Sequence, residues 1–193
     1  MTFASTLGLA AGVIGFIAFV PYIIGTLNRT TKPNKATWIV WSAVGLTIAA
    51  SYYASGARTT AWVPVSYAIG MTIVAILSLR YGVEGWTNLD KCCLAGAGAG
   101  LTLWAITKNP VLAYYLTTAV DAMGFMPTIK KAWDKPEEEA NLAWPIFVVA
   151  NTLNLFAITQ WNFTIALYPV YDIILSGVIT AFVFWPGRRK IKA

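Results

Sequence analysis

The sequence contains no histidine, and its only two cysteines, Cys92 and Cys93, are adjacent. Adjacent cysteines make a poor disulfide pair and a poor metal site, and the simplest interpretation is two small apolar residues in a helix. Without histidine, His-based metal sites, haem sites and catalytic triads are excluded. We therefore expect a protein with no metal and no cofactor, and one that is not an enzyme.

Charged residues are also scarce. They make up 11% of the 193 residues, whereas hydrophobic residues make up 58%. Soluble domains usually have about 25% charged residues, so this chain has too little polar surface to cover a globule. We expect an integral membrane protein in contact with a lipid bilayer. The longest polar stretch, residues 131–141, is only a loop, which indicates one membrane unit without a separate soluble domain.

Seven apolar runs are long enough to be membrane spans, since a helix needs roughly 20 apolar residues to cross the hydrocarbon core. The fold expected is all-α, with seven transmembrane helices. The fourth run is the weakest, and its alternating Gly and Ala residues favour close helix packing. The runs cover residues 5–27, 36–55, 60–80, 89–107, 110–131, 140–160 and 163–186.

The basic residues predict how these spans are oriented. Lys and Arg gather in the first, third and fifth connections and in the tail 188–193, whereas the other connections hold only Arg58 and Lys108. The positive-inside rule then places the N-terminus outside and the C-terminus in the cytoplasm of a membrane that remains unassigned. A basic cytoplasmic anchor explains the tail better than nucleic-acid binding, so no nucleic-acid partner is expected.

One segment of the chain is repeated. Residues 12–46 are echoed by residues 118–152, so that Pro21 matches Pro127 and Trp38 matches Trp144. A second anchor follows in each half, Pro64 in WVPVSYAIG and Pro169 in LYPVYDIIL.

Three-span repeats need one extra helix to lie parallel to each other, and the fourth run supplies it. The predicted organisation is three spans, one linker and three spans. The predicted units are a first repeat at 1–86, a linker helix at 87–108, a second repeat at 109–187 and a basic tail at 188–193.

This 3+1+3 organisation resembles the SWEET sugar transporters and the wider PQ-loop superfamily, which includes lysosomal amino-acid exporters. The stretches that carry the resemblance are GFMPTIKKAWDKPEEEAN at 124–141, ANTLNLFAI at 150–158 and PVYDII at 169–174. The resemblance implies two parallel three-helix bundles and the transport of a small polar solute, a sugar first of all.

Prolines recur in both halves near the ends of the predicted spans. A proline inside a helix removes a backbone hydrogen bond and kinks the helix. Because alternating access needs places where a bundle bends, we predict that these prolines are hinges. They are Pro21, Pro64, Pro127, Pro145 and Pro169.

Asp121 and Asp172 are the only acidic residues well inside spans. Ionisable groups in a membrane are costly and mark solute pathways or proton relays. Neither acid has an evident Lys or Arg partner within the spans, which favours a neutral carboxyl or a water-filled cavity. We predict that both take part in proton coupling.

Several polar and aromatic residues are candidates for substrate binding. Asn151 and Asn154 share one helix face, and their amides both donate and accept hydrogen bonds. Trp41 is the best candidate for stacking on a sugar ring. Near the repeated prolines lie three more candidates, Ser66, Tyr67 and Tyr171. We assign the remaining tryptophans near span ends, Trp38, Trp62, Trp144 and Trp161, to an aromatic belt at the membrane interface.

Three functions remain open at this stage. The first is a transporter of a small polar solute by alternating access, and the second is a proton-coupled carrier of an amino acid or vitamin. The third is a seven-helix receptor or sorting protein without transport. An intramembrane enzyme would need Asp121 and Asp172 to converge within hydrogen-bond reach. The sequence also leaves open whether the protein forms a homo-oligomer.

Overall fold

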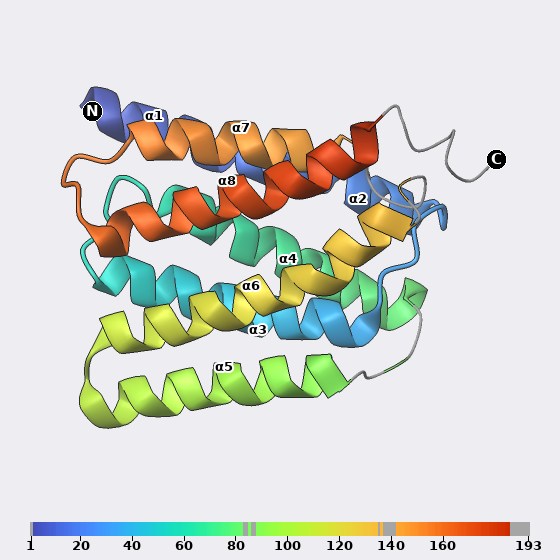
Figure 1. The fold of residues 1–193 in the computed structure, drawn as a ribbon, viewed down its shortest axis with the longest axis horizontal. Helices are drawn as coiled ribbons and strands as arrows, with labels where there is room; N and C mark the ends of the chain where they lie inside the picture. The colour runs from blue at the N-terminus through green and yellow to red at the C-terminus, as the bar shows by residue number, and fades with distance from the viewer. Residues whose placement is uncertain (1, 83–84, 86–87, 135, 137–141, 186–193) are drawn as a thin grey trace.

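The computed structural model describes residues 2–82, 85, 88–134, 136 and 142–185. Within these ranges all regular structure is helical, which confirms the all-α prediction. The helices are α1 Phe3–Ile17, α2 Phe19–Leu27, α3 Lys35–Ala54, α4 Trp62–Tyr81, α5 Asn88–Thr107, α6 Pro110–Asp134, α7 Ala143–Phe156 and α8 Phe163–Phe184 (Figure 1).

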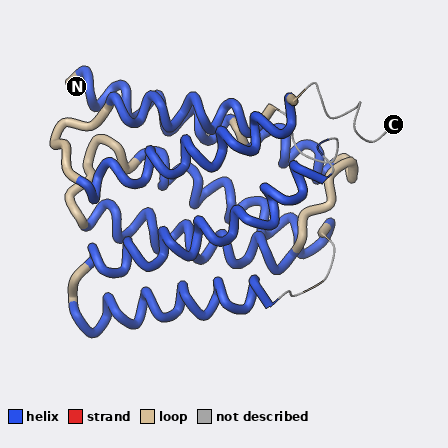
Figure 2. The backbone as a smooth tube through the Cα atoms, in the orientation of Figure 1, coloured by secondary structure: helices blue, strands red, loops and turns tan. Residues whose placement is uncertain are grey.

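Three helical segments of the described chain are long and apolar enough to cross a membrane. They are Phe3–Leu27, which combines α1 and α2, then α4 and α8. The other predicted spans also fall on helices, although α7 is shorter than its predicted range. Figure 2 shows the helices running along one common direction, with loops at both ends.

The first predicted span is interrupted at Ala18, between α1 and α2. Pro21 explains the position of this break. It has no N–H for the carbonyl four residues earlier, at Ile17, and its ring clashes with that carbonyl. The break therefore lies where a hinge at Pro21 would act. Its counterpart in the second half, Pro127, lies within the uninterrupted helix α6.

The other predicted hinge prolines lie at two kinds of position. Pro64 and Pro145 are each the third residue of their helices, α4 and α7. In that first turn the backbone N–H has no partner within the helix, so these prolines interrupt no helical hydrogen bond. Pro169 is inside α8 and buried.

The packing of the helices follows the sequence repeat. In the first half α4 packs against both α1 and α3; in the second half α8 packs against both α6 and α7. Between the halves, α1 packs against α7 and α3 packs against α6. The repeat matches α1 with α6, α3 with α7 and α4 with α8. When each helix is replaced by its match, every one of these contacts becomes another contact of the same set. Helix α5 lies outside this pattern and packs against α6 and α3 at one side of the bundle (Figure 1).

Glycines allow α1 to approach α4 closely. A methyl group at Gly12 would lie 2.8 Å from Cβ of Trp62, and one at Gly15 would lie 2.8 Å from Cε1 of Tyr67. Small residues at helix interfaces permit such close contact between backbones. The close approach packs α1 directly against Trp62 and Tyr67 of α4.

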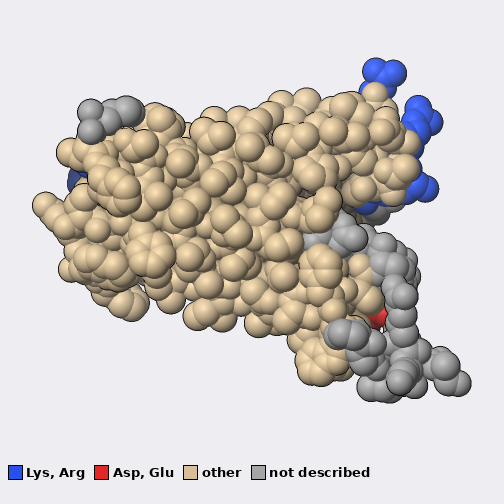
Figure 3. Space-filling model, turned by 90° about the horizontal axis from the view of Figure 1, so that it is seen from above, with Lys and Arg blue, Asp and Glu red and all other residues tan. Residues whose placement is uncertain are grey.

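The two ends of the bundle differ in charge. The chain begins at one end and α8 finishes at the other (Figure 1). Lys and Arg side chains gather mainly at the end where α8 finishes, which we call the basic end, and the opposite end is the far end (Figure 3). At the basic end, Arg29 and Lys32 lie in the connection between α2 and α3, and Lys35, Arg80 and Lys91 lie near the ends of α3, α4 and α5. The connections at the far end contain Arg58 and Lys108. The predicted tail 188–193 lies outside the described residues.

Candidate functional site

A cavity of about 320 Å³ lies between the two halves, bounded by α2, α3, α4, α6, α7 and α8. Its mouth is at the basic end, where it reaches Asn34 and the exposed side chain of Lys32 in the connection between α2 and α3. Deeper in the bundle it reaches Tyr67 and Asp172.

Most residues that line the cavity fall into pairs related by the sequence repeat. Each member of a pair occupies the matching position in its own half, so the cavity lies where the two repeats face each other. The pairs are Phe19 with Phe125, Tyr22 with Thr128, Thr37 with Ala143, Trp38 with Trp144, Trp41 with Phe147, Tyr67 with Asp172, and Met71 with Ser176.

Six of these side chains form a closed circuit of ring contacts around the cavity, which we call the aromatic girdle. The three residues from each half match one another through the repeat. Such edge-to-face and tilted contacts are the favoured geometry for aromatic pairs. The ring-centroid distances around the circuit are Phe19–Trp38 6.4 Å, Trp38–Trp41 5.4 Å, Trp41–Phe125 6.0 Å, Phe125–Trp144 6.1 Å, Trp144–Phe147 5.7 Å and Phe147–Phe19 5.1 Å.

Four buried polar side chains lie together at the inner end, and we call them the polar floor: Tyr67, Asn151, Asp172 and Ser176. The Asn151 amide donates to the Tyr67 hydroxyl at 2.7 Å and to Asp172 Oδ1 at 2.9 Å. Ser176 Oγ donates to the same carboxylate oxygen at 3.0 Å. Because both hydrogen bonds use Oδ1, Oδ2 of Asp172 is left for a ligand in the cavity that this residue lines.

The second predicted acid, Asp121, lies apart from the cavity. Its side chain is only 4% exposed, and its Oδ2 accepts a hydrogen bond of 2.7 Å from the Tyr171 hydroxyl. Its Oδ1 has no hydrogen-bond partner among the described residues. Asp121 and Asp172 thus have different neighbours, and the wall of the cavity includes only Asp172.

The remaining candidate residues are divided between the cavity and its surroundings. Trp41 and Tyr67 line the cavity. Asn154 is fully buried, and neither polar atom of its amide has a partner among the described residues. Ser66 donates to the Val63 carbonyl at 2.8 Å and borders a separate apolar groove between α1 and α4.

Sequence reasoning missed several lining residues. Trp38 and Trp144 do not belong to an interfacial belt, because both are 8% exposed and lie in the aromatic girdle. Trp62 and Trp161, by contrast, are 45% and 66% exposed. Two signals were available: Trp38 and Trp144 match in the repeat, and Ser176 follows Asp172 by one helical turn, which puts both on one face.

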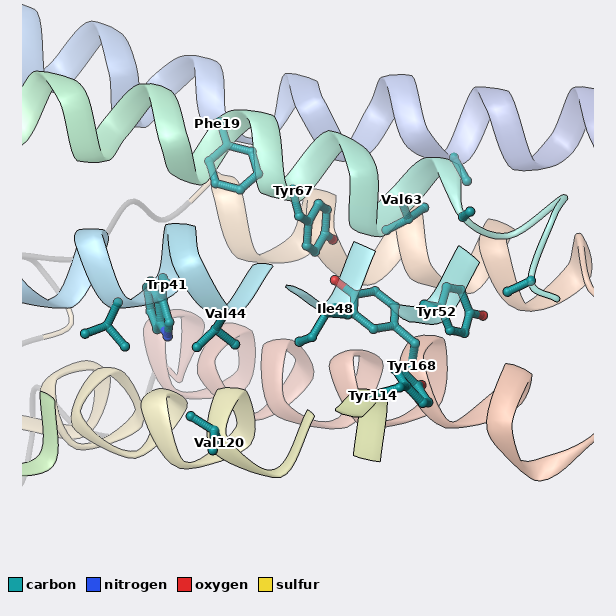
Figure 4. Close-up of a cluster of buried hydrophobic side chains, with 14 of the residues drawn as sticks. Phe19, Trp41, Val44, Ile48, Tyr52, Val63, Tyr67, Tyr114, Val120 and Tyr168 are labelled. Atoms are coloured by element: carbon teal, nitrogen blue, oxygen red, sulfur yellow. The ribbon is translucent and has the colours of Figure 1, made fainter. Parts of the chain in front are cut away.

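The far end of the bundle is closed by direct contacts between the halves. The Tyr52 hydroxyl donates to the Ile165 carbonyl at 2.7 Å, and Thr59 Oγ1 donates to the Ala157 carbonyl at 2.8 Å. Rings of Tyr114 and Tyr168 pack on Tyr52 with centroid distances of 5.2 and 5.7 Å. Figure 4 shows these tyrosines in one buried cluster that extends to Tyr67.

The groups that line the cavity are one carboxyl, hydroxyl groups and aromatic rings, with the ammonium of Lys32 and the amide of Asn34 at the mouth. In the described ranges no three His, Cys, Asp or Glu side chains are grouped so that they could hold a metal ion. The arrangement is suited to binding a small molecule through hydrogen bonds, charge and ring contacts.

The chain matches no protein-family model, no curated protein and no solved structure. Its function is therefore argued from the repeat, the cavity and the polar floor.

Proposed function

We propose that this protein is a membrane carrier that moves a small polar solute by alternating access between two three-helix units. The observation that carries the proposal is the paired lining of the cavity by residues at matching positions of the repeat. Carriers built from repeats commonly bind their solute where the two repeats meet near the middle of the membrane.

The proposed architecture is the 3+1+3 arrangement of seven spans. It treats α1 and α2 as one span and α5 as the linker. Its support is the exchange symmetry of the main helix contacts, in which α5 takes no part. The basic end would face the cytoplasm, with the N-terminus outside, because cytoplasmic connections are enriched in Lys and Arg.

The structure then corresponds to an inward-open state of the carrier. The cavity reaches Lys32 at the basic end, whereas Tyr52 and Thr59 join the halves at the far end. Alternation requires the far-end contacts to part while the mouth closes. Of the proposed hinges, Pro21 has the strongest support because a helix break lies beside it.

The resemblance to SWEET transporters makes a sugar the first solute to test. A sugar would bind through hydrogen bonds to Asp172 and Ser176 and by stacking on Trp41. Purified protein reconstituted into proteoliposomes should show saturable uptake of at least one solute from a panel of sugars, amino acids, vitamins and amines. The absence of flux for the whole panel would overturn the proposal, and saturable binding without flux would indicate a receptor instead.

Proton coupling is the second candidate, and the position of Asp172 favours it. Asp172 is 2% exposed and lines the cavity, and the hydrogen bonds that it accepts from described residues come from the neutral groups of Asn151 and Ser176. A buried carboxyl of this kind gains or loses a proton when its surroundings change. Under this candidate, Asp172→Asn abolishes uptake driven by a pH gradient and leaves counterflow intact.

A further inference from the structure

We infer that the cavity selects a small organic cation, with its ammonium group at Asp172 and its apolar body inside the aromatic girdle. The inference rests on the carrier function proposed above and names the class of its solute.

The wall of the cavity between floor and mouth is aromatic. The six girdle residues form a closed circuit in which neighbouring centroids are 5.1 to 6.4 Å apart. Aromatic rings attract cations through their quadrupole, and cages of such rings are the usual means by which proteins recognise quaternary ammonium groups. A sugar needs several hydrogen-bond partners around its ring, and this part of the wall has few polar groups.

The charge of the wall also favours a cation. Among the described lining residues only Asp172 and Lys32 are charged. Asp172 is 2% exposed, so a negative charge on its carboxyl would act in a medium of low dielectric, whereas Lys32 is exposed at the mouth and screened by water. A buried carboxylate without a basic partner is stabilised by a cationic ligand. Among the described residues both hydrogen bonds to Asp172 use Oδ1, so a ligand at Oδ2 displaces neither.

The size and asymmetry of the cavity narrow the class of solute further. A volume of about 320 Å³ is at the small end of the range of roughly 300–1,000 Å³ for small-molecule sites. The residue that matches Asp172 in the first half is Tyr67, so the carboxylate has no counterpart across the cavity. We therefore expect a compact solute with one positive charge, bound in one orientation.

The test compares choline with 3,3-dimethylbutan-1-ol, its neutral analogue of almost the same shape. Binding to the protein in lipid nanodiscs is followed by intrinsic tryptophan fluorescence and by calorimetry. We expect choline to bind about tenfold or more tightly than the alcohol, because cation–π and ion-pair interactions are lost when the charge is removed.

Two variants locate the selectivity. Asp172→Asn should remove most of the preference for choline and leave the weak binding of the alcohol unchanged. Asp121→Asn removes the same charge from a buried site outside the cavity and should keep the preference. Because the choline-to-alcohol comparison is made on the unmodified protein, the test remains decisive even if a variant fails to fold.

The outcomes separate this inference from the carrier proposal. Equal affinity for choline and the alcohol, no binding of choline, or binding of glucose while choline is inert would each overturn the cation inference. None of these results bears on the carrier proposal. That proposal is overturned only if no solute of the whole panel shows flux in proteoliposomes.

Discussion

Tyr67 and Asp172 occupy matching positions in the two sequence repeats, and the amide of Asn151 donates a hydrogen bond to both. The two halves therefore share a backbone arrangement at the polar floor but differ in the side chain that each presents. A phenol faces the cavity from the first half and a carboxylate from the second. The repeat gives the cavity a symmetric shape. The difference between these two side chains puts a carboxyl group on one side of the cavity and a phenol on the other.

Asn151 and Asn154 provide a matched pair for testing the polar floor. Both are fully buried on α7, but only Asn151 has hydrogen-bond partners among the described residues. Asn151→Leu should lower the free energy of unfolding by about 1–2 kcal/mol, because Tyr67 and Asp172 lose a buried donor. Asn154→Leu should be neutral or stabilising, because it removes an unpaired amide. Thermal unfolding in detergent measures both, and equal destabilisation would contradict the described network.

Gly124 tests the contact that holds Trp41 in the aromatic girdle. A methyl group at Gly124 would collide with the indole nitrogen of Trp41, whereas one at Gly177 would meet no atom within 4 Å. Gly124→Ala should displace the indole, shift its fluorescence and cost about 1–3 kcal/mol of stability through overpacking. Gly177→Ala is the control and should leave the fluorescence unchanged. If fluorescence and solute binding were both unaltered in Gly124→Ala, Trp41 would not lie against Gly124 as described.

Tyr52 tests whether the far end acts as a gate. Its hydroxyl donates to Ile165 in the other half, whereas the Tyr115 hydroxyl is hydrogen-bonded to Thr164 within the second half. Tyr52→Phe should loosen the far end, and Tyr115→Phe should not. Spin labels at Arg58 and Gln160, in a background with Cys92 and Cys93 replaced by Ser, would report the distance between the halves. A far end that is equally closed in both variants would rule out this gate.

The carboxyl of Asp172 should make cation binding depend on pH. A proton and a cationic solute compete for one buried carboxylate, so lowering the pH should weaken choline binding. The titratable groups that interact with Asp172 are Asp121, Tyr67, Tyr168 and Tyr171, with Lys32 at the mouth of the cavity. The pH dependence should vanish in Asp172→Asn and persist in Asp121→Asn. If instead it vanished only in Asp121→Asn, the second acid would be the coupling group.

The positions of the helices could be predicted from hydropathy, because a run of apolar residues underlies each helical segment of the described chain. The residues at which the helices begin and end were harder to predict. The run 140–160 contains α7, which ends at Phe156 because the chain turns at Ala157 to enter α8. The break at Ala18 follows from Pro21, yet the matching Pro127 lies in a continuous helix, so proline alone does not determine where a helix is interrupted.

The candidate site could be predicted only in part. Asp172, Trp41 and Tyr67 were identifiable because acids and repeated aromatic segments are unusual within spans. For Trp38 and Trp144 the only signal was their match in the repeat. Hydropathy gave none, because a membrane helix is apolar on all sides and its sequence does not show which face is inside. For the same reason Asp121 and Asp172 look alike in sequence, although only Asp172 reaches the cavity.

The central claim is that the two halves must part at the far end for solute to cross. The most direct test is uptake by proteoliposomes that contain a double variant, Arg58→Cys with Gln160→Cys, in the Cys92→Ser, Cys93→Ser background. Joining the two thiols with a reducible bis-maleimide should stop the flux, and reduction of the linker should restore it. Flux that continues unchanged with the far end locked, while the same linker is shown to be in place, would contradict alternating access between the two halves.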